Sequence, residues 1–178
     1  MNIVKTDFKD LLIINHDVYH DSRGLFKEVF RKNVIEENLG YKINFCQDNN
    51  IKSSYMVLRG LHYQEEPHAQ SKLVSVTEGK ILDIAVDIRE NSKTYGKYFS
   101  YVLSSDNHKS IFIPKGFAHG YLTLSEYADV NYKVDNYYNK NQEKGICFKD
   151  KYLNIDWGVG ENELIISDKD KNLDNFKW

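Results

Sequence analysis

Two short segments of the sequence gather side chains that can move protons or bind polar ligands. In the first, residues 57–64, Arg59, His62 and Gln64 fall within six positions of a strand-like stretch. In the second, residues 114–120, His119 follows a Pro-Lys-Gly turn at the expected mouth of a strand. A lone histidine on a strand is most often a hydrogen-bonded core residue. Two such segments together indicate a polar ligand site at one end of a β-barrel.

Strand geometry predicts which of these side chains share a face. Successive side chains of a strand point to opposite faces. His62 and Gln64 are therefore expected on one face of residues 57–64, and Arg59 and Tyr63 on the other. A regular strand would separate the imidazole of His62 from the guanidinium of Arg59.

The histidines are compatible with a metal centre or with acid–base catalysis. The second segment resembles half of a cupin motif, and cupin jelly rolls often hold iron, manganese or zinc on several histidines and a carboxylate. A metal cupin has His-x-His in the first segment, where this chain has His62-Tyr63-Gln64. His62, His119 and His68 then lack a clear carboxylate partner, so the metal case is weak. We expect no metal.

Acid–base catalysis needs a base, an acid and a group that stabilises the charge formed between them. His62 could be the base, and Tyr132, on an inward position of a strand, could return the proton. Lys72 could direct its cation at developing negative charge, and an aspartate in residues 167–170 could orient a histidine. Each also has a structural interpretation: Tyr132 is one of 13 tyrosines that could simply pack, Lys72 could be solvated, and residues 167–170 could be a charged tail.

Strands must position these side chains, because strand-type segments dominate the sequence. The 13 Tyr and 9 Phe beside 2 Pro favour pleated, half-buried structure. In residues 80–88 apolar side chains alternate with others, Leu82 and Ile84 sharing one face and Asp83 and Ala85 the other, which predicts a half-buried strand. Residues 72–76 precede it across a turn that contains Gly79, which predicts a hairpin.

Further short elements follow at close spacing. Many short strands of this kind predict an all-β fold, a jelly roll. A short helix before Gly40 and one helical turn near the end complete the pattern. The expected strands are 98–103, 110–113, 120–124 and 130–138, and the expected helical segments are 31–39 and 139–144.

Size and composition exclude several classes of protein. The chain of 178 residues and 20.9 kDa has no repeat or linker, so we expect one domain over residues 1–178. Its net charge of −2, with interleaved acids and bases, disfavours nucleic-acid binding. Cys46 and Cys147 match no zinc or disulfide spacing, which favours a reducing cytoplasm. The apolar run at residues 11–14 is too short for an export signal or a membrane span, so no membrane association is expected.

The motifs, taken in order, resemble the dTDP-4-dehydrorhamnose 3,5-epimerase family. Any one of them would be weak, but they occur in register from about Asp21 to Asp170. The matching blocks are Asp21 to Gly24 with Phe26 and Glu28, Gln47 to Asn49, Leu58 to Gln64, Pro67 to Gln70 with Lys72 to Val74, Ile113 to Gly120, Tyr132-Lys133 with Tyr137-Tyr138, and Ser167 to Asp170.

The resemblance implies an epimerase with a cupin jelly roll, or double-stranded β-helix, that uses no cofactor. Such an enzyme is a homodimer that inverts carbons 3 and 5 of a dTDP-4-keto-6-deoxy-glucose-type sugar. Both carbons flank the ketone. The family implies a place after a 4,6-dehydratase and before a 4-reductase, in the supply of L-rhamnose-type sugars for polysaccharides such as lipopolysaccharide.

The same resemblance implies roles for individual residues. His62 resembles the base, Asp170 the carboxylate that holds its imidazole, Tyr132 the acid on the opposite ring face, and Lys72 the cation beside the carbonyl oxygen. Phe26 and Tyr138 resemble contacts to the nucleotide base. The full set of implied substrate-binding residues is Arg23, Phe26, Glu28, Gln47, Asn49, Arg59, His119, Tyr138, Glu143 and Lys169.

Asn50, Ile51 and Ser75 depart from the family pattern. None is an expected acid or base, so these departures bear on the identity of the nucleotide and sugar. The alternatives are an enzyme that inverts a single carbon, a ketoisomerase on a similar cupin, and a non-catalytic sugar-binding cupin. The last needs neither a base nor an acid, so the presence of both argues against it.

Overall fold

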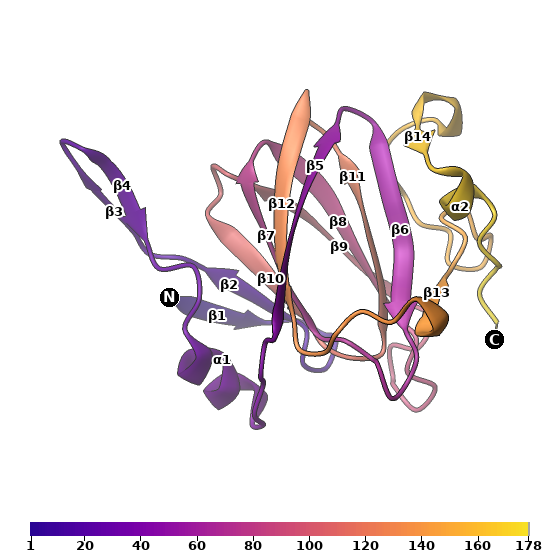
Figure 1. Cartoon of the computed structure of the whole chain (residues 1–178), viewed down its shortest axis with the longest axis horizontal. Helices are drawn as coiled ribbons and strands as arrows, with labels where there is room; N and C mark the ends of the chain where they lie inside the picture. Colours follow the sequence, from indigo (N-terminus) through magenta and orange to yellow (C-terminus); the bar gives the residue numbers. More distant parts are fainter. Residues whose placement is uncertain (178) are drawn as a thin grey trace.

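Two β-sheets face each other in the computed structural model, which describes residues 1–177 (Figure 1). Its elements are β1 (Asn2–Lys5), β2 (Leu12–Asn15), β3 (Val18–Asp21), β4 (Gly24–Lys27), α1 (Lys32–Leu39), β5 (Gln47–Ser54), β6 (Val57–Gln64), β7 (Lys72–Glu78), β8 (Lys80–Asp87), β9 (Tyr98–Ser104), β10 (Lys109–Ile113), β11 (Phe117–Thr123), β12 (Tyr127–Val134), the 3-10 turn η1 (Lys140–Gln142), β13 (Glu143–Gly145), the 3-10 turn η2 (Glu161–Glu163), β14 (Ile165–Ile166) and α2 (Asp168–Lys171). The first sheet has the strand order β1-β2-β10-β7-β12-β5. The second has the order β13-β6-β11-β8-β9, with β14 beside β6.

The predicted all-β jelly roll is confirmed. From β5 onward the chain changes sheet at every connection between strands up to β13, except from β8 to β9. Inward side chains of both sheets, such as Val74 of β7, Ile81 of β8 and Ile111 of β10, pack into one apolar cluster. The core therefore lies between the sheets, and any cavity there is walled by strands on both sides.

The predicted hairpin of residues 72–76 and 80–88 is wrong. β7 pairs with β10 and β12 in the first sheet, whereas β8 pairs with β9 and β11 in the second. The chain crosses between the sheets at Gly79, which has a φ of +79°. A Cβ atom there would come within 2.1 Å of the Tyr127 carbonyl oxygen, so the crossing needs glycine. A tight glycine turn serves a crossover as well as a hairpin.

The strand at residues 80–88 forms, as β8, but it is not half-buried. Ile81 and Ala85 face the core between the sheets. Ile84 and Val86 face outward and are nevertheless buried, because the C-terminal segment covers them with residues such as Trp157. The alternation predicted two faces correctly, and the long segment after β13 buries the second of them.

Helix α1 lies close to its expected range of 31–39, whereas β12 begins three and ends four residues before the strand expected at 130–138. The helix ends at Gly40, whose backbone N–H donates to the Glu36 carbonyl oxygen at 2.8 Å. Its Ile35 packs with Phe112 on the outer face of the first sheet. The strand expected at 130–138 ends at Val134, after which the Asp135 carboxylate accepts the Ser71 N–H at 2.6 Å. The loop after β12 is thereby tied to the loop before β7.

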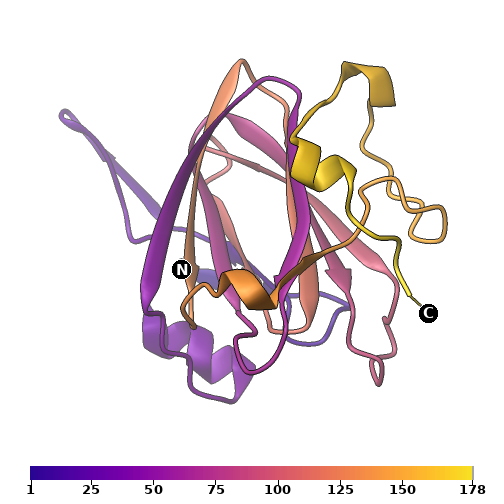
Figure 2. The ribbon, with the colours of Figure 1, turned by 45° about the vertical axis from the view of Figure 1, so that its right-hand side comes forward.

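Two peripheral segments complete the fold. β3 and β4 form a two-stranded arm that projects from the side of the sheets (Figure 1). The C-terminal segment lies on the other side, where β14 pairs with β6 and α2 contacts the same strand (Figure 2). Within residues 1–177, the structure has no helix long and apolar enough to cross a membrane.

Candidate active site

A cavity of about 260 Å³ opens between the two sheets. Strands of both sheets and the start of helix α2 supply its walls. It brings together all four residues expected to be catalytic and three of those expected to bind substrate. The lining side chains are Ile51, Arg59, His62, Lys72, His119, Tyr121, Val130, Tyr132, Ser167, Lys169 and Asp170, with Gly120.

His62 and Asp170 form a hydrogen-bonded pair on one wall. The His62 Nε2 atom lies 2.7 Å from Asp170 Oδ1, and Asp170 Oδ2 accepts the Gly60 backbone N–H at 3.0 Å. Burial favours the protonated acid, but the bonds from His62 and Gly60 outweigh it and hold the pKa of Asp170 below its usual range. The carboxylate therefore accepts Nε2–H, which leaves Nδ1 as the basic nitrogen of His62.

The local backbone explains how Arg59 also enters the cavity. A regular strand would place Arg59 and His62 on opposite faces, and this prediction is wrong. On β11, Tyr121 lies opposite Arg59 and His119 opposite His62, so β6 carries one extra residue in a bulge. Gly60 has a φ of +110°, and a Cβ atom there would lie 2.7 Å from the Gly120 Cα. The bulge shifts the alternation by one residue and turns both side chains inward.

Lys72 and Tyr132 supply a cation and a phenol on the first sheet. Burial lowers the pKa of Lys72 to about 8, although the charges of Asp83 and Glu143 oppose this. Lys72 is therefore an ammonium ion at neutral pH. Burial raises the pKa of Tyr132 above that of an ordinary phenol, so Tyr132 keeps its proton at neutral pH. The cavity thus holds a carboxylate-bound imidazole, an ammonium ion and a protonated phenol.

His119 is paired with the carboxylate of Asp83, which was not among the expected site residues. Its Nε2 atom lies 2.8 Å from Oδ2 of Asp83, a fully buried residue of β8. Burial lowers the pKa of His119 more than Asp83 raises it, which keeps the imidazole neutral near pH 7. The sequence could have identified Asp83, because an acid on the inward face of a strand with Ile81 and Ala85 is unusual without a partner.

A connected polar group lies beside the cavity. Glu143 Oε2 accepts the Tyr138 hydroxyl at 2.8 Å and lies 2.6 Å from Lys169 Nζ. Gln47 donates to the Asn49 side-chain oxygen at 2.8 Å and accepts the Tyr138 backbone N–H at 3.4 Å. The structure therefore brings together five of the expected substrate-binding residues, and Lys169 joins them to the cavity.

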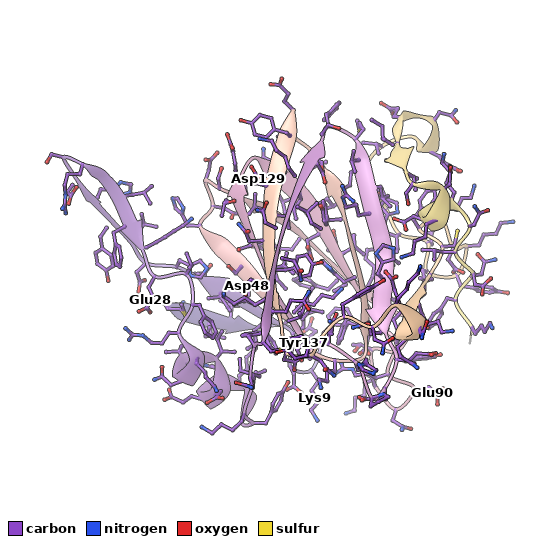
Figure 3. All side chains as sticks on the ribbon, in the orientation of Figure 1. Lys9, Glu28, Asp48, Glu90, Asp129 and Tyr137 are labelled. Carbon is purple, nitrogen blue, oxygen red and sulfur yellow. The ribbon has the colours of Figure 1, made fainter. Side chains whose placement is uncertain are left out.

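The other expected substrate-binding residues, Arg23, Phe26 and Glu28, lie on or at the base of the arm. The Arg23 side chain is 89% exposed and bonded to Asp21, and Phe26 is 67% exposed. Glu28 pairs with Arg31 at 2.8 Å. Figure 3 shows Glu28 at the base of the arm, across the molecule from β6. The structure does not bring these residues to the cavity of their own chain.

The histidines and acids of the cavity are also possible metal ligands. Across residues 1–177, no three His, Cys, Asp or Glu side chains are grouped so that they could hold a metal ion. His62 and His119 are each hydrogen-bonded to a separate carboxylate. The arrangement provides two imidazole–carboxylate pairs, an ammonium ion and a phenol around one cavity, which suits proton transfer at a carbon next to a carbonyl group.

Comparisons with known proteins agree with this chemistry. The family described as dTDP-4-dehydrorhamnose 3,5-epimerase matches residues 5–177. A protein of that description from Shigella flexneri is 49% identical over 176 residues, covering 99% of this chain and 96% of the relative.

Solved structures give the same result. The dTDP-4-dehydrorhamnose 3,5-epimerase of Elizabethkingia anophelis NUHP1 superposes with a TM-score of 0.95 at 49% identity, over 99% of this chain and 96% of the other. The dTDP-6-deoxy-D-glucose-3,5-epimerase of Legionella pneumophila Philadelphia 1, in complex with dTDP-4-keto-L-rhamnose, superposes with a TM-score of 0.93 at 44% identity, over 98% and 92%. Because the family matches residues 5–177 of this chain and the expected catalytic residues surround one cavity, the chain belongs to the dTDP-4-dehydrorhamnose 3,5-epimerase family.

Proposed function

We propose that this chain inverts carbons 3 and 5 of dTDP-4-keto-6-deoxy-glucose in the cavity between its sheets. The observation that carries the proposal is the convergence of the His62–Asp170 pair, Lys72 and Tyr132 on that one cavity. Family membership supports it, as does the dTDP-4-keto-L-rhamnose bound to the Legionella relative.

The first step is removal of a proton next to the ketone. An imidazole with a pKa of about 6.5 is too weak a base for such a proton unless the resulting enolate is stabilised. Nδ1 of His62 takes the proton, and Asp170 stabilises the imidazolium that forms. The Lys72 ammonium ion faces the oxygen on which negative charge develops. One well-placed donor of this kind is worth about 2.7–4 kcal/mol in the transition state.

Inversion then requires a proton from the opposite face of the ring. In a D-gluco sugar the hydrogens on carbons 3 and 5 lie on the same ring face, so His62 can serve both centres. Tyr132 lines the cavity from the opposite sheet and carries its proton at neutral pH. It delivers the proton to the face that His62 does not reach. A base and a separate acid suit an inversion better than one group that takes and returns the proton.

The nucleotide is bound by the polar group beside the cavity. Lys169 and Arg59 supply positive charge for the diphosphate, and both line the cavity. Tyr138 is half-exposed and offers a ring face to the thymine base. Gln47 accepts the backbone N–H of Tyr138 and donates to the Asn49 side-chain oxygen, and the Asn49 amide adds a donor. His119 is neutral and contacts the sugar by hydrogen bonding.

Deuterium incorporation tests the proposed function. The enzyme is incubated with dTDP-4-keto-6-deoxy-glucose in heavy water, and NMR reads deuterium at carbons 3 and 5. Label at both carbons is expected, with an L-sugar recovered when a 4-reductase traps the product. Label at one carbon would show a mono-epimerase instead. No label, with this substrate and with other 4-keto nucleotide sugars, would contradict the proposal.

We also propose that the enzyme is a homodimer whose arm reaches the partner subunit. Arg23 and Phe26 are expected to bind nucleotide, yet they lie on an arm that projects away from the cavity of their own chain. Tyr19 and Leu25 of the arm are also exposed, which favours an arm that packs on another subunit. A cytoplasmic location is part of the same proposal, supported by the free Cys46 and Cys147.

Light scattering tests the proposed dimer and is expected to give twice the chain mass of 20.9 kDa.

Mixing two variants tests whether the arm acts on the partner subunit. His62→Asn should be inactive, and Arg23→Ala should have a raised KM because it loses ground-state binding. If the arm serves the partner subunit, one cavity of a mixed dimer has both His62 and an intact arm, so mixing restores activity at low substrate. If the subunits exchange between dimers and activity is not recovered, the arm does not act on the partner subunit.

A further inference from the structure

Asp83 lies behind the cavity and has no role in the mechanism above. It sits on β8 with its side chain between the sheets and is fully buried. Its Oδ2 atom is bonded to His119, whereas Oδ1 is buried and has no hydrogen-bond partner among residues 1–177. A buried carboxylate oxygen without a donor is costly, so a polar group or a water molecule is expected there.

Beyond its bonded partner His119, the Asp83 carboxylate also acts on Lys72, which lines the same cavity as His119. Two carboxylates favour the charged form of Lys72, first Asp83 and then Glu143. Glu143 is already bonded to Lys169 and Tyr138 through Oε2. The Oδ1 atom of Asp83 accepts no hydrogen bond within residues 1–177, and the ammonium ion of Lys72 has hydrogens to donate.

The remaining groups around Lys72 do not replace Asp83. Arg59 and Lys169 line the same cavity and are cations that disfavour a further positive charge. Asp170 is engaged by His62 and Gly60. The phenols Tyr121 and Tyr132 have pKa values raised by burial and are uncharged at neutral pH. His119 is neutral at that pH.

We propose that Asp83 is a positioning residue that keeps Lys72 in its ammonium form and orients His119 in the same cavity. Oδ2 holds the imidazole at 2.8 Å, and Oδ1 accepts a hydrogen bond from one water molecule that in turn accepts one from the Lys72 ammonium ion. The inference rests on the proposed function, because it explains how a buried lysine stays charged opposite an enolate.

Removing the negative charge of Asp83 should lower the pKa of Lys72. With Asp83 present, burial lowers the pKa of Lys72 only to about 8. Without the negative charge of Asp83, burial acts with less opposition, so the pKa of Lys72 falls further. Lys72 then loses its proton at a lower pH, and the enolate loses its cation there. The alkaline limb of the kcat profile is expected to move to lower pH.

The titration of Lys72 in the substrate-free protein tests the proposal. Protein labelled with ¹³C-lysine is followed by NMR against pH, and Lys72→Arg identifies the Lys72 signal. The wild-type midpoint is expected near 8. In Asp83→Asn the midpoint should fall by about one unit or more, a tenfold change in proton affinity. Should Asp83→Asn fail to fold, Asp83→Ser, which leaves room for water, serves the same measurement.

His119→Gln is the matched control, because it removes the imidazole and leaves the Asp83 charge in place. Its Lys72 midpoint is expected not to fall. An unchanged midpoint in the Asp83 variants, or an equal fall in His119→Gln, would overturn the inference. The titration needs no turnover, so its outcome is separate from the proposed function, whose failure would appear as a wild-type enzyme that incorporates no deuterium.

Discussion

Replacing His62 with asparagine is expected to lower deuterium incorporation at both carbons by about 10²–10⁴-fold, the usual range for loss of a general base. The asparagine side chain is polar and about as long as the near half of the histidine side chain, but its amide cannot accept the α-proton. Because the hydrogens on carbons 3 and 5 lie on one ring face, a single base serves both, so both positions should lose label together. The measurement is the NMR exchange experiment in heavy water.

A second histidine provides a control for this variant. His108 lies in a turn with a φ of +52°, a conformation that asparagine tolerates well, and it does not line the cavity. His108→Asn should therefore exchange at the wild-type rate. His62→Asn should still fold and bind dTDP, since Lys169, Glu143 and Tyr138 are unchanged. Near-normal exchange in folded His62→Asn would remove His62 as the base.

Replacing Tyr132 with phenylalanine is expected to separate proton removal from inversion. His62 can still form the enolate and return a proton to the face from which it came, so deuterium enters the sugar with retained configuration. Inverted product should fall by about 10²–10⁴-fold, because the acid on the other face is lost. The 4-reductase trap measures inversion, and NMR of the same sample measures exchange.

Tyr127 gives the matched control on the same strand. Its hydroxyl donates to Glu78 at the sheet surface, and it does not line the cavity. Tyr127→Phe should invert the sugar at the wild-type rate. If Tyr132→Phe inverted both carbons at that rate, another acid would have to act, and Tyr121, the second phenol in the cavity, would be the first to test.

The surroundings of Asp170, Tyr132 and Lys72 set the pKa values of these groups, and so the protonation states that the proposed reaction uses. Asp170 is held as a carboxylate by two hydrogen bonds, although it is buried. Tyr132 is held as a phenol by burial. Lys72 remains charged at neutral pH, yet its pKa of about 8 places it close to losing its proton. Asp83 and Glu143 both favour the charged form of Lys72, and Asp83 is the one with a buried oxygen that accepts no hydrogen bond within residues 1–177.

Local patterns allowed much of the fold to be predicted, but not the partners of each strand. The alternation in residues 80–88 predicted β8 correctly, because side-chain direction along a strand depends on the local backbone alone. It could not show that β7 and β8 belong to different sheets, since a glycine turn suits both a hairpin and a crossover. It also could not show the burial of Ile84 and Val86, which depends on Trp157 far along the chain.

The sequence by itself determined the residue types of the site and the family to which their order belongs. His62, Tyr132 and Lys72 were candidates from their local segments, and the family resemblance selected Asp170 from the aspartates of residues 167–170. Only the tertiary structure decided which atoms meet: the bulge at Gly60 turns Arg59 to the side of His62, and β8 places Asp83 behind His119. These contacts join residues distant in the chain, so they depend on strand register and burial, which no local spacing encodes.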